Sequence, residues 1–151
     1  MNLPEAKRAP NRGNVTNPQL EYEHRCRVGS FEVYFCKDGL IYARNTDKNA
    51  VHDLELAKEY NATIERVVGP TAHRPMVIDL TVPLSLTIEA QNYYTSPEGG
   101  TNIKAVAFVT PSFLSRVIGN LLLGAKPAAL PLKLFDKPEY AIHWLKQFPA
   151  E

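Results

Sequence analysis

Two short apolar runs constrain the fold of this chain more than any other feature of its sequence. MVIDL occupies residues 76–80 and KAVAFV occupies residues 104–109, and each run contains a single charged residue, Asp79 in the first and Lys104 in the second. Runs of this length are typical of strands that are covered on both faces. Because helix-forming segments alternate with them, the sequence predicts an α/β layer fold whose later strands run parallel.

The segments before these runs predict a β-hairpin and a helix. FEVYFC and LIYARN flank Lys37-Asp38-Gly39, whose Asp-Gly step is a strong tight-turn signal. Residues 53–68 repeat apolar side chains at three- and four-residue steps and are followed by Gly69-Pro70. This pattern indicates an amphipathic helix of about four turns that stops at the glycine.

Capping signals predict the later elements. Thr87 is placed as the N-cap of a short helix, with Glu89 in its first turn. LKLF, residues 132–135, predicts a last strand, and Asp136 to Glu139 form a capping box that opens a final helix. One face of that helix carries Ala141, Trp144, Leu145 and Phe148.

The predicted order is strand, strand, helix, strand, helix, strand, helix, strand, helix. It corresponds to a mixed, mostly parallel sheet of about five strands flanked by helices, in which the hairpin supplies one antiparallel neighbour. Residues 1–20 mix Pro, Asn, Arg and Gly without periodicity, which predicts a flexible tail. Residues 21–151 have the length of a single domain.

The charge balance and the apolar pattern exclude several classes of partner. A formal net charge of +1 leaves no global attraction for nucleic acid. No run reaches the ~18 apolar residues of a membrane span, and the start MNLPEAKRAP lacks the apolar stretch of a signal peptide. We therefore expect a cytoplasmic protein without stable membrane insertion, in which Cys26 and Cys36 are buried free thiols.

The sequence holds no strong signature of catalysis or of metal binding. Nucleophilic catalysis needs a Cys or Ser beside a histidine base and an orienting acid, and a structural zinc site needs four ligands. No spacing brings the histidines together, since they fall in a tail, a helix start, a loop and a helix face: His24, His52, His73 and His143. We therefore expect no catalytic residues, no metal, no cofactor and no enzymatic activity.

The segment TPSFLSRVIGNLLLGAKP, residues 110–127, predicts a helix with apolar side chains on nearly every face. Thr110 and Pro111 suit the N-cap and first helical position, and Gly124 with Pro127 ends the helix. In one interpretation, the AKPAALP loop that follows the helix covers it. In a second, the helix is a partner-binding or homodimer face, and in a third it attaches the protein to a membrane. The residues of the interface interpretation are Arg116, Asn120, Leu122 and Leu123.

The best polar cluster lies where two predicted parallel strands end. Ligands and partners tend to meet this edge of a parallel sheet, and the residues there are Asp79, Thr81, Ser85, Thr87, Thr110, Ser112, Ser115 and Arg116. They suit helix caps and loop bonds, or an anion, phosphate or partner contact with Arg116 as the counter-charge. Ser85 and Thr87 are also candidate phosphorylation sites, because a helix start stabilises a phosphate.

The element order, with MVIDL and KAVAFV each leading through a short loop into a helix, resembles the STAS fold of bacterial anti-sigma-factor antagonists. Residues 104–127, followed by LKLFDKPEYAIHWLKQF, are similar to small bacterial STAS-like proteins known mostly as domains of unknown function. The resemblance covers roughly residues 30–148. In the antagonists the strand matching MVIDL leads to a phosphorylated serine, whereas TVPLSLTIEA here lacks the Asp-Ser-Ser-Gly pattern.

This resemblance implies a STAS-like regulatory or scaffolding module that acts by protein–protein interaction. Its partner would be another protein, with a second copy of the chain included as a homodimer. The alternative is a binding domain for a small anionic or lipid-like ligand, seated between the apolar helix and residues 85–87, with Arg116 as its anchor.

Overall fold

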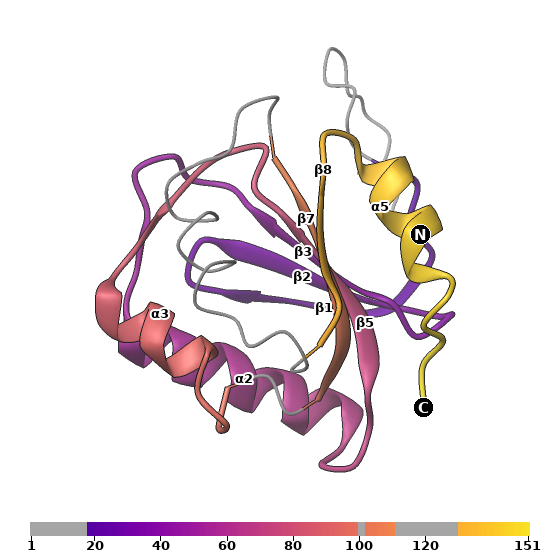
Figure 1. The fold of residues 1–151 in the computed structure, drawn as a ribbon, viewed down its shortest axis with the longest axis horizontal. Coiled ribbons are helices and arrows are strands. Elements are labelled where there is room, and N and C mark those ends of the chain that lie inside the picture. Colours follow the sequence, from indigo (N-terminus) through magenta and orange to yellow (C-terminus); the bar gives the residue numbers. More distant parts are fainter. Residues whose placement is uncertain (1–17, 100–101, 111–129) are drawn as a thin grey trace.

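A six-stranded sheet organises the part of the chain that the structure describes (Figure 1). The structure is a computed structural model and describes residues 18–99, 102–110 and 130–151. In spatial order the strands are β1 (Tyr22–Val28), β2 (Phe31–Cys36), β3 (Ile41–Asn45), β5 (Arg74–Asp79), β7 (Ile103–Val109) and β8 (Leu132–Phe135).

The sheet has an antiparallel half and a parallel half. β2 pairs antiparallel with both β1 and β3. The pairs β3–β5, β5–β7 and β7–β8 are parallel. The predicted hairpin, the predicted α/β class and the mostly parallel sheet are therefore confirmed. The sheet has six strands instead of about five, because β1 was not predicted.

β1, the strand that was not predicted, has few of the sequence signals by which strands are recognised. It carries His24, Arg25 and Arg27, and its apolar residues are divided between the faces: Cys26 and Val28 pack against one core and Tyr22 against the other. A polar edge strand shows too little apolar alternation to be recognised alone. His24 consequently lies on β1, which corrects its assignment to a tail.

Three helices flank the sheet in the described part of the chain: α2 (Leu54–Val68), α3 (Ile88–Tyr94) and α5 (Pro138–Leu145). α2 and α3 lie on one face and α5 lies on the other (Figure 1). The predicted cap of α3 is confirmed, since Thr87 accepts the backbone N–H of Ala90. α2 has a cap that was not predicted, Asp53, which accepts the backbone N–H of Leu56.

The capping box predicted for the last helix is wrong. The N-cap of α5 is Lys137, and its side chain makes no capping hydrogen bond. Pro138 occupies the first helical position, where its fixed φ suits the helix and its missing donor costs nothing. The proline therefore sets the start of the helix one residue later than Asp136 would have done.

A second, smaller parallel sheet consists of two strands of two residues each, β4 (Val51–His52) and β6 (Ser85–Leu86). Strands this short have no periodicity to detect in a sequence. β4 runs directly into the N-cap of α2, and β6 runs directly into that of α3. The small sheet therefore holds the starts of the two helices together.

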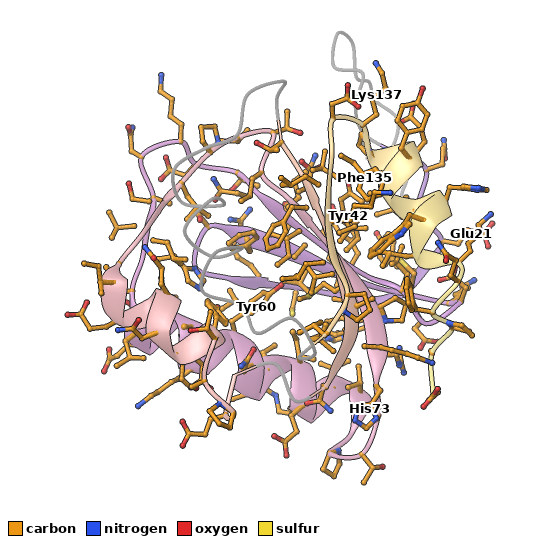
Figure 2. The ribbon with its side chains drawn as sticks, in the orientation of Figure 1. Glu21, Tyr42, Tyr60, His73, Phe135 and Lys137 are labelled. Carbon is orange, nitrogen blue, oxygen red and sulfur yellow. The ribbon has the colours of Figure 1, made fainter. Side chains whose placement is uncertain are left out.

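Two apolar cores lie on opposite faces of the sheet. The first includes Phe35, Ile64 and Phe108 and packs under α2, whereas the second includes Val77 and Leu145 and packs under α5. Figure 2 labels one buried tyrosine in each layer, Tyr60 on α2 and Tyr42 on the sheet side that faces α5. The predicted apolar face of the last helix is confirmed for Ala141, Trp144 and Leu145, which belong to the second core. Phe148 packs against the same core but lies beyond the end of α5.

The predicted helix of residues 110–124 lies outside the described residues, apart from Thr110. Residues 1–17 of the predicted tail are also outside them, and Leu20 packs against the second core. No helix in the described ranges is long and apolar enough to cross a membrane.

Two glycines with nearly the same φ provide a matched test of packing at the turn between β2 and β3. Gly39 has φ +98° and Gly69 has φ +97°, but a Cβ on Gly39 would lie 2.5 Å from Cβ of Ala150, whereas a Cβ on Gly69 meets nothing within 4 Å. Alanine at either position should cost about 1–3 kcal/mol of backbone strain. We expect Gly39→Ala to lose more unfolding free energy in urea than Gly69→Ala, and Ala150→Gly to recover the excess. Equal losses would contradict the clash.

Candidate functional site

A buried carboxylate marks the end of β5. Asp79 is 1% exposed, and its Oδ2 accepts a 2.6 Å hydrogen bond from the hydroxyl of Tyr42 on β3. Its Oδ1 accepts the backbone N–H of Thr81 at 2.9 Å and the hydroxyl of Thr81 at 2.6 Å. Burial, followed by the charge of Asp79, raises the pKa of Tyr42, so the phenol stays a donor. Both carboxylate oxygens are therefore bonded within the chain.

The loop after β5, which contains Thr81, is also held by hydrogen bonds from the end of β3. Asn45 is 1% exposed, and its Nδ2 donates to the carbonyl oxygens of Val82 at 2.8 Å and Pro83 at 3.0 Å. Its Oδ1 accepts the hydroxyl of Ser30 at 2.5 Å. The loop after β5 thus receives bonds from two neighbouring strand ends, which fixes its path toward β6.

The structure divides the polar cluster that was predicted at this edge. Asp79 bonds on the α5 face of the sheet, whereas Ser85 lies in β6, where its N–H donates to the carbonyl of Ala50 at 3.0 Å. Thr87 uses its hydroxyl to cap α3 at 3.1 Å from the N–H of Ala90. The two candidate phosphorylation sites therefore lie beside the start of α2, away from Asp79.

Thr110 is the only predicted residue after β7 that falls within the described ranges. It is buried, and its N–H donates to the carbonyl of Phe135 at 3.0 Å. The others lie outside those ranges: Ser112, Ser115, Arg116, Asn120, Leu122 and Leu123. The hypothesis of a small anionic ligand anchored by Arg116 stays a prediction for the same reason.

The antiparallel half of the sheet carries a cluster of charged and aromatic side chains on its α5 side. Glu32 accepts from Nη2 of Arg44 at 2.6 Å, from Nη2 of Arg27 at 3.2 Å and from the hydroxyl of Tyr34 at 3.2 Å. The guanidinium of Arg25 lies 6.0 Å from the centre of the Tyr34 ring. We call these five residues the arginine face: Arg25, Arg27, Glu32, Tyr34 and Arg44.

Strand register produces the arginine face. Arg27 lies opposite Glu32, Arg25 lies opposite Tyr34, and Glu32 lies opposite Arg44. Alternation along each strand then sends these side chains to the face opposite the first core. α5 shares this side of the sheet but packs on β5, β7 and β8, so the arginine face lies beside the helix.

The arginine face has an excess of positive charge. Burial raises the pKa of Glu32, but the hydrogen bond and charge of Arg44, aided by Tyr34 and Arg27, outweigh it and leave the pKa below its usual value. One carboxylate faces three guanidinium groups, and the Arg27 side chain is still 53% exposed. A guanidinium has five N–H donors, so the exposed arginines can bind further carboxylates.

A second polar cluster joins β4, α2 and α3. His52 is 5% exposed, and its Nε2 lies 2.7 Å from the hydroxyl of Tyr94, whose ring stacks on the imidazole. Phe31 and Tyr60 contact the His52 ring edge-on. Burial lowers the pKa of His52, partly offset by Asp53. His52 therefore stays neutral within a packed aromatic cluster, in a structural position.

The two cysteines are free thiols, as predicted, but only Cys36 is buried. Cys26 and Cys36 are both free, with Cys36 buried and Cys26 half-buried, and burial raises the pKa of Cys36 to about 12. Within the described ranges, no three His, Cys, Asp or Glu side chains are placed to hold a metal ion.

A family model described as a domain of unknown function (DUF7793) matches residues 34–149. The chain belongs to this family. No curated protein and no solved structure matches the chain. Within this DUF7793 chain, the match includes β3, β5, β7, β8 and all three described helices, but β1 precedes it.

The sequence did not predict the arginine face, although part of its signal was present. Glu32 and Tyr34 alternate with apolar residues in one strand of the predicted hairpin, and Tyr42 and Arg44 do so in the other. That period of two indicates a shared polar face. The contribution of β1 was hidden, because the register that sets Arg27 opposite Glu32 requires a strand that was not predicted.

Two buried tyrosine hydroxyls, one on each side of the sheet, provide a test of how much the hydrogen bond to Asp79 stabilises the fold. Tyr42→Phe deprives the Asp79 carboxylate of a donor, and hydrogen bonds to charged groups contribute about 1.5–3 kcal/mol. Tyr60 instead donates to Sδ of Met76 at 3.3 Å, and a thioether is a weak acceptor. We expect Tyr42→Phe to lower the unfolding free energy in urea by about 2 kcal/mol, and more than Tyr60→Phe does. Equal losses would contradict this role for Asp79.

The burial of His52 should make stability depend on pH. Its folded pKa lies below its unfolded value of about 6.5, so below that pH the unfolded chain binds the proton first. Stability should therefore be complete above pH ~6.5 and fall as the pH drops toward the folded pKa. We expect urea unfolding from pH 7.5 to 5.5 to show a smaller loss in His52→Gln than in the wild type. The exposed His143→Gln is the control, and a slope lowered equally by both variants would argue against His52.

Proposed function

We propose that this chain is a non-enzymatic, STAS-like regulatory or scaffolding module that acts by binding another protein chain. The observation that carries the proposal is the arginine face. It places two exposed guanidinium groups, Arg25 and Arg27, beside the half-buried ring of Tyr34 on a broad strand surface. Arginine and tyrosine are enriched where proteins bind one another.

The chemistry of this surface favours a protein partner with exposed carboxylates. Glu32 holds the guanidinium groups of Arg27 and Arg44 by ion pairs, so these two charges are oriented before a partner arrives, which lowers the entropic cost of binding. A guanidinium forms paired hydrogen bonds with a carboxylate. The net charge of the whole chain is only +1, which provides little of the long-range attraction on which nucleic-acid binding depends.

The STAS-like part of the proposal is supported by the connectivity. An antiparallel hairpin leads into parallel strands, of which β3 and β5 are joined through α2 and β5 and β7 through a fixed loop and the short helix α3. These features agree with the resemblance on which the assignment is based. The loop has no Asp-Ser-Ser-Gly pattern, and its exposed serine, Ser85, belongs to a strand. The proposed module therefore binds without the serine switch of the antagonists.

Site-specific photocrosslinking tests the proposed function. A benzoylphenylalanine probe replaces Tyr34 on the arginine face, and the same probe replaces Tyr140, which is 55% exposed on α5, as the control. In a lysate of the source organism, we expect the first probe to form discrete protein adducts, which mass spectrometry identifies, and the control to form none of them.

The captured protein is then purified and its Kd measured. We expect Arg27→Glu to weaken binding at least about tenfold, because it sets two carboxylates against a partner selected for carboxylates. Lys58→Glu changes the net charge equally on the exposed side of α2 and should leave the Kd unchanged. Equal labelling by both probes, or equal effects of both substitutions, would refute the proposal.

A further inference from the structure

The arginine face lies on the half of the sheet that no described helix covers from that side. α5 shares this side of the sheet but packs on β5, β7 and β8, whereas α2 and α3 lie on the opposite face (Figure 1). In the described part of the chain, the α5 side of β1 and β2 is therefore a surface of strand side chains. Helices cover the sheet faces of α/β folds, so this surface has the position of one further helix.

The geometry of a sheet face limits which element can bind there. The N–H and C=O groups of a strand point toward its neighbours within the sheet, so they are not available to a chain that lies on the face. An extended segment in this position would find no backbone partners in the sheet, whereas a helix satisfies most of its backbone groups internally. Extended segments add to sheet edges instead. A helix is therefore the element that suits the arginine face.

Helix and strand spacings agree at the charged end of this surface. Arg25 and Arg27 are two residues apart in the regular part of β1, because the register shift lies earlier, between Tyr22 and His24. Two residues of a strand span about 6.7 Å. On a helix, two residues four positions apart share a face and are separated by about 6 Å along the axis. Two carboxylates at this helical spacing can therefore each face one arginine.

Both arginines keep the capacity to bind such carboxylates. Arg27 donates to Glu32 and to the hydroxyl of Thr46, yet 53% of its side chain is exposed. The guanidinium of Arg25 lies 6.0 Å from the centre of the Tyr34 ring, and the residue is exposed. Because a guanidinium has five N–H donors, each group retains donors for a partner.

The surface becomes aromatic beyond Arg25. The rings of Tyr22 and Tyr34 meet edge-on with their centres 5.1 Å apart, and both rings pack on the second core while staying partly exposed. This contact places Tyr22 on the same face as Arg25 despite the register shift. Three strand residues separate the two along β1, a distance of about 10 Å, which equals about two helical turns. Partly exposed rings can bury an apolar side chain of a partner.

We propose that the partner docks an amphipathic helix along β1 and β2. Two carboxylates of this helix, four residues apart, face Arg27 and Arg25, and an apolar side chain about two turns further along packs on Tyr22 and Tyr34. The charges fix the register, and the rings provide the apolar burial. This inference rests on the proposed function and names the element and the residue pattern that the partner presents.

A competing explanation is that any flexible acidic segment neutralises the arginines. Attraction of that kind depends on the number of carboxylates and on the salt concentration, not on their spacing. A helix that packs on the face, in contrast, must present both carboxylates and the apolar residue on one side. The spacing of the acids therefore distinguishes the two explanations.

Synthetic helical peptides test the spacing with the full chain. The probe is a fluorescein-labelled peptide of about four turns, held helical by a hydrocarbon staple on its far side. It carries two glutamates four residues apart and a leucine seven residues further along. The control has the same composition, staple and charge, but its glutamates are two residues apart and so lie on different faces. We expect fluorescence anisotropy to give the control a Kd at least about tenfold higher. Equal Kd values would overturn the inference.

Double-mutant cycles test the register of the helix. Arg25→Gln and Arg27→Gln are each measured against peptides in which one glutamate or the other is replaced by glutamine. We expect each arginine to couple with one glutamate by about threefold in Kd, and with the other glutamate by much less, because only one lies opposite. Lys58→Gln on α2 is the control and should couple with neither. Circular dichroism should show that all variants are folded. Equal coupling of each arginine to both glutamates would overturn the inference.

The protein captured by the Tyr34 probe separates the inference from the proposed function. Hydrogen exchange of its complex identifies the bound segment, in which we expect a protected helix with acids four residues apart. A bound segment that is extended would overturn the inference and leave the proposed function standing. If the probe captures no protein while the stapled peptides show the expected spacing and coupling, the proposed function fails and the helix specificity of the face remains. If the peptides also fail to distinguish the spacings, both fail.

Discussion

A carboxylate can remain in a protein core only when donors satisfy it, and the arrangement around Asp79 depends on this requirement. Tyr42 approaches from β3 and Thr81 from the loop, so the charge ties the two central parallel strands to the segment that leaves the sheet. Asn45 repeats the fastening one strand end away. Together they determine where the chain turns back toward β6 and, through it, where α2 and α3 begin.

The fate of the predicted polar edge follows from that constraint. The end of β5 has the polar composition of a binding site, yet its side chains form hydrogen bonds that hold the loop after β5. Ser85 and Thr87 are carried to the opposite face, where β6 and the start of α3 use their backbone and hydroxyl groups. The polar groups with unused capacity lie instead on the antiparallel half of the sheet, where Arg25 and Arg27 reach solvent. Residue type alone did not distinguish these two uses.

The elements that the sequence predicted share a strong local signal. The Asp-Gly turn, the continuous run around Val77, the periodic helix ending at Gly69 and the cap at Thr87 each depend on neighbouring residues. What escaped prediction depends on distant ones: β4 and β6 exist because they pair with each other, and the arginine face exists because of strand register. The capping box failed where two local signals competed, and the geometry of Pro138 prevailed over the polar cap.

The short connections of the antiparallel half have a consequence for how the chain folds. Two residues join β1 to β2 and four join β2 to β3, whereas β3 reaches β5 only after α2 has been traversed. Contacts between near neighbours in sequence form with little loss of chain entropy, and distant ones form more slowly. We therefore expect the β1–β3 meander to be among the earliest parts of the domain to form. A nascent chain would then have its charged edge strand in place before the parallel half of the sheet is complete.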